Sequence, residues 1–131
     1  MFNASPFHAA VASSDLARSR AWYEEKLGLT PKLEEGPSLW YEFAPGTWLM
    51  VYESQYAGTA KNTVAGWTVE GIGAVMTALR AGGIAFEDYD FGNGMATVDG
   101  LMTVGPYQAC WFKDPDGNTF EISEVDRSAT G

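Results

Sequence analysis

The 131-residue chain is short of cysteine and of basic residues, and each shortage excludes a class of function. Cys110 is the only cysteine, so no intrachain disulfide can form and a reducing cytoplasm is the expected compartment. Within its predicted strand, Cys110 is interpreted as a small buried hydrophobe rather than a reactive thiol. Eight Lys and Arg against 17 Asp and Glu give a formal net charge of −9, which argues against nucleic-acid binding because phosphates require basic patches. The acidic charge favours cationic ligands or serves solubility alone.

The chain also lacks a long apolar run that could span a membrane, so we expect no membrane association. Residues 1–12 have neither the basic start nor the continuous apolar stretch of a secretion signal. Core material is plentiful, since 46% of the residues are hydrophobic and 14% are aromatic. This composition predicts one compact domain over residues 1–131.

The sequence reads as two copies of one unit, with a period of roughly 55 residues. In the first copy, a strand is predicted over residues 7–12. Either Ser14 or Asp15 is expected to cap a helix that begins at Leu16, and Gly28 is expected to end it.

The second copy repeats this order of elements. A strand is predicted over residues 64–69, and the helix that follows has one apolar face at the spacing i, i+3, i+4 and i+7. That face consists of Ile72, Val75, Met76 and Leu79. Two glycines, Gly82 and Gly83, are expected to end the helix.

After each helix the hydrophobic pattern changes to the period of two that is typical of strands. Residues 39–43 and 48–52 flank a turn at Ala44–Thr47 in the first copy. Residues 109–112 and 119–123 flank a second turn in the other copy. Each half is therefore predicted to be a βαβββ module.

The two predicted modules cover about residues 6–60 and about residues 61–126. At about 60 residues, neither would bury enough apolar surface to be stable alone, so we expect the two to share a core. A ferredoxin-like α+β sandwich without a ligand site fits the same pattern. Periodicity alone does not separate the two alternatives.

The most informative stretch is the turn at residues 114–118, which reads Asp-Pro-Asp-Gly-Asn. Aspartate in the first position, proline in the second and glycine in the fourth favour a type I turn. If Phe120 and Ile122 face the core, Glu121 and Ser123 face the other way, by the two-residue alternation of a strand. A glutamate that lines a cavity is therefore predicted.

This turn and its glutamate resemble the closing hairpin of the vicinal oxygen chelate superfamily, which includes glyoxalase I, bleomycin-resistance proteins and extradiol dioxygenases. The Leu27-Gly28-Leu29 ending of the first helix is also similar to that family. The resemblance implies an α+β fold in which two tandem βαβββ modules form an open, cup-shaped mixed sheet. It also implies four inward metal-ligand positions, on the first and last strands of each module.

Only two of these four positions hold a strong metal ligand. His8, the only histidine, stands in the first position and Glu121 in the last. The third position falls on Val64, which has no donor atom, and the second on Met50 or Tyr52, which suit a hard metal centre poorly. We therefore expect weak binding of Zn, Ni, Mn or Fe at His8 and Glu121, and no stoichiometric divalent metal.

Glu53 would be a third ligand if its strand shifted register by one residue. Without a metal, a facing His8 and Glu121 would form a pair of general acid and general base. His8 has an alternative interpretation as a partly buried imidazole that is hydrogen-bonded to a neighbour.

The remaining inward positions are aromatic or small, which predicts a pocket for flat or apolar molecules. The predicted ligand-binding residues are Trp40, Trp48, Met50, Tyr52 and Thr68, with Gly66 beside them. Trp67 is predicted to be core. The glycine-rich segment 89–107 is either a flap over the cup or only a connection.

Two classes of function follow from these expectations. The first is an enzyme, a glyoxalase-like lyase or isomerase or a dioxygenase, in which a metal or the pair of His8 and Glu121 stabilises an enolate-like intermediate. The second is a metal-free binder that sequesters a drug-like or cationic small molecule. An interaction module with a vestigial pocket is a third alternative. We also expect a homodimer, because exposed strand edges invite pairing with another chain.

Overall fold

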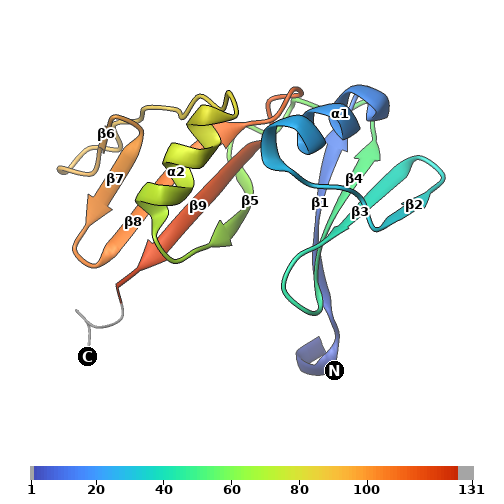
Figure 1. Cartoon of the computed structure of the whole chain (residues 1–131), viewed down its shortest axis with the longest axis horizontal. Helices are drawn as coiled ribbons and strands as arrows, with labels where there is room; N and C mark the ends of the chain where they lie inside the picture. The colour runs from blue at the N-terminus through green and yellow to red at the C-terminus, as the bar shows by residue number, and fades with distance from the viewer. Residues whose placement is uncertain (1, 127–131) are drawn as a thin grey trace. The chain divides into compact units, whose positions relative to one another are not determined.

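The computed structural model describes residues 2–126, so both limits of the predicted 1–131 domain lie outside the described residues (Figure 1). The chain divides into two compact units. The first unit holds the chain up to Val64 together with residues 114–118, and the second holds residues 65–113 and the chain from Thr119. The first of these units extends to residue 64, whereas the predicted modules meet near residue 60, and the division into two repeated modules stays a prediction. The turn at 114–118 belongs to the first unit rather than the second.

The first unit has a four-stranded sheet and one long helix. The chain enters through a short 3₁₀ helix, η1, and the sheet has the order β1-β4-β3-β2. Strand β1 is parallel to β4, and the other neighbours are antiparallel. The elements are η1 (Phe2–Ala4), β1 (Phe7–Ser13), α1 (Leu16–Leu27), β2 (Leu33–Glu35), β3 (Ser38–Glu42) and β4 (Thr47–Glu53).

Helix α1 begins and ends at the predicted residues. Of the two candidate caps, Asp15 is the one used, and its carboxylate accepts a hydrogen bond from the Arg18 backbone N–H at 3.1 Å. Gly28 adopts the left-handed conformation with φ of 68°. The N–H of Leu29 then reaches the carbonyl of Tyr23 at 3.0 Å, which closes the last turn of the helix.

The second unit has a five-stranded sheet of order β5-β9-β8-β7-β6 and one helix, which packs against β9 (Figure 1). Strands β5 and β9 run in the same direction in Figure 1, and the other neighbours are antiparallel. The elements are β5 (Thr63–Thr68), α2 (Ile72–Ala81), β6 (Thr97–Val98), β7 (Leu101–Val104), β8 (Tyr107–Lys113) and β9 (Thr119–Val125). The predicted α+β class is confirmed, and each unit contains one mixed sheet.

The glycine-rich segment 89–107 is more regular than predicted. It contains β6 and β7, so the second half has four strands after its helix rather than three. The N–H of Phe91 bonds to the carbonyl of Met95 at 2.8 Å and so closes the tip of the segment. The rings of Tyr89 and Phe91 then pack at 5.6 and 5.5 Å from Trp111, on the sheet of the same unit. The role as a flap over a cup stays a prediction.

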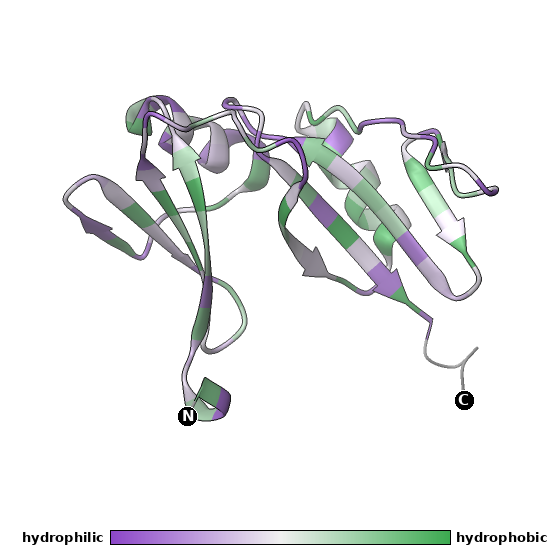
Figure 2. Cartoon of the chain, turned by 180° about the vertical axis from the view of Figure 1, so that it is seen from behind, coloured by the Kyte–Doolittle hydropathy of each residue, from purple (hydrophilic) through white to green (hydrophobic). Residues whose placement is uncertain are grey.

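The alternation along β9 is visible in Figure 2, where hydrophobic and hydrophilic residues follow one another. Phe120 and Ile122 are buried, whereas Glu121 is half-buried, as the period of two predicts. Trp67 stacks on Phe112 with ring planes 7° apart and lies 5.3 Å from Phe120. Its predicted place in the core is confirmed.

The start of α2 depends on a residue far along the chain. Its N-cap is Gly71, which is in the left-handed conformation and has no side chain to cap the helix. The carboxylate of Glu124 on β9 accepts from the N–H groups of Gly71 at 2.6 Å and Ile72 at 3.0 Å. Glu124 therefore supplies the negative charge and the acceptors that a helix N-terminus requires.

Residues 114–117 form a hydrogen-bonded β-turn, with the N–H of Gly117 bonded to the carbonyl of Asp114 at 3.0 Å. Its buried Asp114 carboxylate accepts from the Tyr23 hydroxyl at 2.7 Å, and Asn118 donates to the Ala12 carbonyl at 2.9 Å. Burial, followed by the neighbouring carboxylate of Asp114, raises the pKa of Tyr23 far above its ordinary value. The turn thus joins α1 and β1 of the first unit, which the sequence motif did not predict.

Asp116 adds a second set of contacts between the turn and the start of α1. Its Oδ1 atom accepts from the backbone N–H and the hydroxyl of Ser14 and from the guanidinium of Arg18 at 2.9 Å. Burial opposes the charge on Asp116, but these donors together hold the pKa of its carboxyl below the usual value.

In the described part of the chain, no helix is both long and apolar enough to cross a membrane.

Candidate functional site

The aromatic residues that the sequence singled out lie on one face of the first sheet. Leu49 and Val51 are buried on the face that packs against α1, so Trp48, Met50 and Tyr52 occupy the opposite face by alternation. We call this second surface the open face of the first sheet. Its members are His8 from β1, Trp40 from β3, and Trp48, Met50 and Tyr52 from β4.

Three rings form a continuous row on the open face. The strand register places His8 beside Trp48 and Trp40 beside Met50. The His8 imidazole lies 4.9 Å from the ring of Trp40, and Trp40 lies 6.3 Å from Trp48, both in edge-to-face arrangements. Edge-to-face pairs at these separations are favourable, so the rings hold one another in place.

Small residues lie beside these rings. Ala10 and Ala12 on β1 are the register neighbours of Met50 and Tyr52. His8 is exposed and the two tryptophans are half-buried, so aromatic surface remains accessible to solvent. Accessible rings beside small side chains are suited to a flat, apolar ligand.

The side chain of Lys32 places a positive charge beside the Trp48 ring. The ammonium of Lys32 lies 5.8 Å from the centre of the Trp48 ring and 2.6 Å from the carboxylate of Glu42. The backbone N–H of Lys32 also bonds to the Trp40 carbonyl at 2.8 Å. The sequence analysis did not identify Lys32, which lies outside the predicted strands. Its contact with Trp48 is a cation–π interaction.

Glu121 lies in the second unit, on the face of β9 opposite to α2. Its Oε1 atom accepts a hydrogen bond from the hydroxyl of Tyr107 at 2.8 Å. Burial, followed by this contact with Glu121, raises the pKa of Tyr107 to about 12, so Tyr107 remains a donor at neutral pH. The sequence analysis missed Tyr107, although the hairpin register that pairs Trp111 with Glu121 puts Tyr107 on the same face of β8.

His8 and Glu121 belong to different units, and each is described within its own unit. A direct pair of general acid and general base therefore stays a prediction. Val64 is the second residue of β5, as His8 is of β1, and its side chain has no donor atom; the equivalence of the two positions stays a prediction. Glu53 alternates with Tyr52, so it is not on the open face, and the register shift that would bring it there does not occur.

The donors needed for a metal site are not grouped in the described part of the chain. Among residues 2–126, no three His, Cys, Asp or Glu side chains form a cluster that would hold a metal ion. A divalent ion normally requires three protein ligands or more in such a site. Val64 and Met50, at two of the positions that the resemblance implies, offer no ligand suited to a hard divalent ion, so the donor set does not fit a complete metal site.

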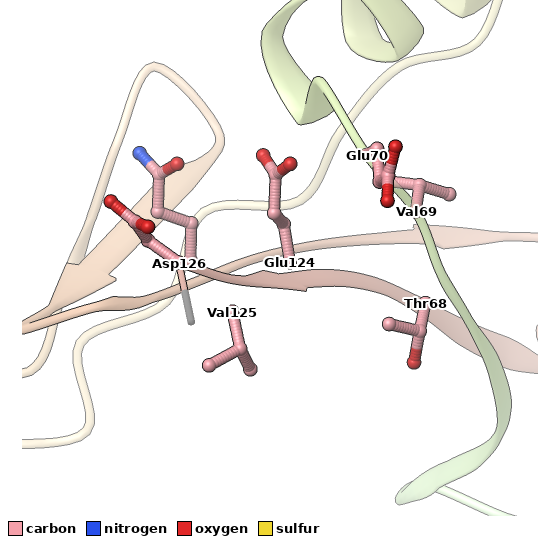
Figure 3. A pocket seen from close by; sticks show the side chains of 7 residues that line it. Thr68, Val69, Glu70, Glu124, Val125 and Asp126 are labelled. Carbon is pink, nitrogen blue, oxygen red and sulfur yellow. The ribbon is translucent and has the colours of Figure 1, made fainter. Parts of the chain in front are cut away.

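A hollow of about 550 Å³ lies in the second unit, at the C-terminal ends of β5 and β9 (Figure 3). Of the predicted ligand residues, only Thr68 lines it, and Figure 3 shows the Thr68 side chain turned away from the carboxylate of Glu124. Because Glu124 caps α2, its charge is already used structurally.

Cys110 is fully buried and burial raises its pKa to about 11, so its predicted role as a small hydrophobe is confirmed.

The comparisons with known proteins agree with this architecture. A family model described as the Glyoxalase/Bleomycin resistance protein/Dioxygenase superfamily matches residues 5–122. No curated protein is similar enough in sequence to be counted as a relative.

Solved structures share the fold at low sequence identity. A glyoxalase / bleomycin resistance protein from Catenulispora acidiphila DSM 44928 is 22% identical, with a TM-score of 0.67 over 93% of this chain and 99% of that one. TnmS3, an antibiotic binding protein from Streptomyces sp. CB03234, is 16% identical, with a TM-score of 0.68 over 96% and 99%. Lactoylglutathione lyase from Agrobacterium tumefaciens is 17% identical, with a TM-score of 0.64 over 92% and 93%.

Proposed function

We propose that this chain, which belongs to the Glyoxalase/Bleomycin resistance protein/Dioxygenase superfamily, binds a flat, apolar organic ligand on the open face of the first sheet without a metal ion. The observation that carries the proposal is the row of rings formed by His8, Trp40 and Trp48. Each ring in such a row offers a face or an edge, and an aromatic contact contributes about 0.5–1.5 kcal/mol beyond the area that it buries.

The chemistry of the side chains favours binding over metal-dependent catalysis. Val64 stands where the family places a ligand, and the described residues contain no cluster of three donors. The row of rings, by contrast, is complete within the first unit. The fold is similar to that of an antibiotic binding protein, TnmS3, at 16% identity. Fold alone does not decide function, so the rings and the donor set are the support for this proposal.

A metal-dependent lyase or isomerase is the second candidate. The observation in its favour is that His8 and Glu121 each match a metal-ligand position of the family. It predicts about one divalent ion per chain after purification, lost in His8→Ala. The binder that we propose predicts a substoichiometric metal content. Elemental analysis of the purified protein separates the two candidates.

The binding proposal is tested by tryptophan fluorescence with planar aromatic probes that carry no charge, of which acridine at mildly alkaline pH is the first. We expect saturable quenching in the wild type and about tenfold weaker binding in Trp48→Ala, equivalent to about 1.4 kcal/mol. Tyr56→Ala is the matched control, because Tyr56 is an exposed aromatic residue of the same unit. Binding that is equally strong in the wild type and in Trp48→Ala would exclude the open face as the site.

A further inference from the structure

Glu121 is a half-buried carboxylate whose acceptor capacity is mostly unused. The Tyr107 hydroxyl donates to its Oε1 atom at 2.8 Å. Within the described residues, no Lys, Arg or His forms an ion pair with Glu121. An ionised carboxylate accepts about four hydrogen bonds. Because partial burial of a charge is unfavourable without partners, this carboxylate favours a partner from outside the chain.

Tyr107 fixes where the remaining acceptors of Glu121 point. The two residues come from neighbouring strands, Tyr107 from the start of β8 and Glu121 from β9. A hydrogen bond at 2.8 Å to one oxygen restricts rotation of the carboxylate and leaves Oε2 available. The site is therefore preorganised by a neutral donor that leaves the negative charge in place.

Space beside the Glu121 side chain is kept free by a glycine. A Cβ atom on Gly66 of β5 would lie 3.3 Å from the Glu121 Cβ and 2.7 Å from its carbonyl oxygen. The side-chain position that would cover Glu121 from β5 is therefore empty. Gly66 and Thr68, its neighbour on the same face, are both exposed. On the β5 side, the residues next to Glu121 are therefore small and uncharged. On the β8 side, Tyr107 contacts Glu121 through its hydroxyl.

We propose that Glu121, oriented by Tyr107 and uncovered by Gly66, forms a binding site in the second unit for a small organic cation with N–H donors, such as an amidinium or a guanidinium. Planar cations of this kind match the geometry of a carboxylate with two parallel donors. A lone carboxylate does not meet the ligand requirement of a divalent metal, but one such carboxylate is sufficient for an N–H cation. The net charge of −9 raises the local concentration of cations around the chain. This site goes beyond the proposed aromatic site, which lies in the first unit.

The test compares benzamidinium with benzamide, two probes of similar shape that differ in charge. Both are titrated against the ¹⁵N-labelled full chain in the Trp48→Ala background, so that stacking on the first unit is weakened. We expect benzamidinium to bind at least about tenfold more tightly than benzamide, with shifts centred on Thr68, Tyr107 and Glu121. In Glu121→Gln, which keeps the shape and removes the charge, the preference should disappear while benzamide binding stays unchanged.

Two further variants separate the site from the general acidity of the chain. Glu70→Gln removes one exposed carboxylate from the same unit and should leave the preference for benzamidinium intact. Tyr107→Phe keeps the charge but releases Oε1, and should weaken benzamidinium severalfold without changing benzamide binding. Equal affinity for the two probes in the starting protein, or a preference that survives in Glu121→Gln, would overturn the proposal. Because the readout is residue-resolved in the second unit, this result is independent of whether the aromatic site exists.

Discussion

Replacing Tyr23 by phenylalanine removes one hydroxyl from a buried hydrogen bond to a carboxylate in the first unit. Tyr23 is fully buried, and Asp114, whose carboxylate accepts a hydrogen bond from the Tyr23 hydroxyl at 2.7 Å, is only 6% exposed. A hydrogen bond to a charged group contributes about 1.5–3 kcal/mol. The phenylalanine ring preserves the packing but leaves Oδ2 of Asp114 with only the side-chain amide of Asn118. We therefore expect the free energy of unfolding to fall by about 2 kcal/mol.

The same substitution should change how stability depends on alkaline pH. The pKa of Tyr23 is raised in the folded chain above its ordinary value of 10.0, chiefly by burial and then by Asp114. A raised folded pKa gives stability that is fully present below the unfolded pKa and is lost as the pH rises. Above pH 10.0 the unfolded state releases this proton and the folded state does not. The contribution of Tyr23 should fall by about 1.4 kcal/mol per pH unit, and the slope of stability against pH should be smaller by this amount in Tyr23→Phe.

Urea unfolding followed by circular dichroism at pH 7 and between pH 10 and 11 measures both effects, with the pH range chosen from the ordinary tyrosine value. Tyr56→Phe is the control, because the Tyr56 side chain is exposed and its hydroxyl should not affect unfolding. A loss of less than about 0.5 kcal/mol in Tyr23→Phe would refute the reasoning, since that is the range of ordinary surface substitutions. An unchanged slope above pH 10 would refute the assignment of that slope to Tyr23.

Three further predictions concern the second unit and the assembly. Glu124→Ala should destabilise the chain by about 0.5–2 kcal/mol, measured by urea unfolding, because α2 loses its only capping carboxylate in the described structure; an effect near zero would show that water replaces it. Gly66→Ala should cost about 1–3 kcal/mol in the same assay, since its Cβ would lie 2.7 Å from the Glu121 carbonyl oxygen, and a neutral result would contradict the close approach of β5 and β9. The homodimer stays a prediction, supported by the unpaired edges of β1 and β2 in the first sheet, and a monomeric mass in light scattering would contradict it.

Local signals predicted most of the elements. The start of α1 at Leu16 and its end at Gly28 follow from a capping aspartate and a left-handed glycine, which act within one helical turn. The faces of β4 follow from strict alternation, which places Leu49 and Val51 on the side of α1 and Trp48 on the open face. These features depend on neighbouring residues, so sequence reasoning finds them.

Features that depend on distant residues were missed. The motif at 114–118 predicts only a local turn before the strand that carries Glu121. Its side chains nevertheless form hydrogen bonds with Tyr23, Ser14 and Ala12, about a hundred residues earlier. Glu124 caps a helix that begins 52 residues before it, and no local pattern announces that contact. The contact of Tyr107 with Glu121 depends on how β8 and β9 pair, because their register puts both side chains on the same face of the sheet. The short strand β6 was missed because its segment is rich in glycine, which lowers strand propensity.

The most direct test of the central claim uses His8, the only histidine in the chain, as a reporter. Its imidazole C–H signals are unambiguous in NMR spectra, and the ring lies 4.9 Å from Trp40 at one end of the aromatic row. If uncharged acridine binds on the open face, these signals should shift with the same dissociation constant as the tryptophan quenching, and Trp48→Ala should weaken both together. Quenching that saturates while the His8 signals stay unchanged would place the ligand elsewhere and contradict the account.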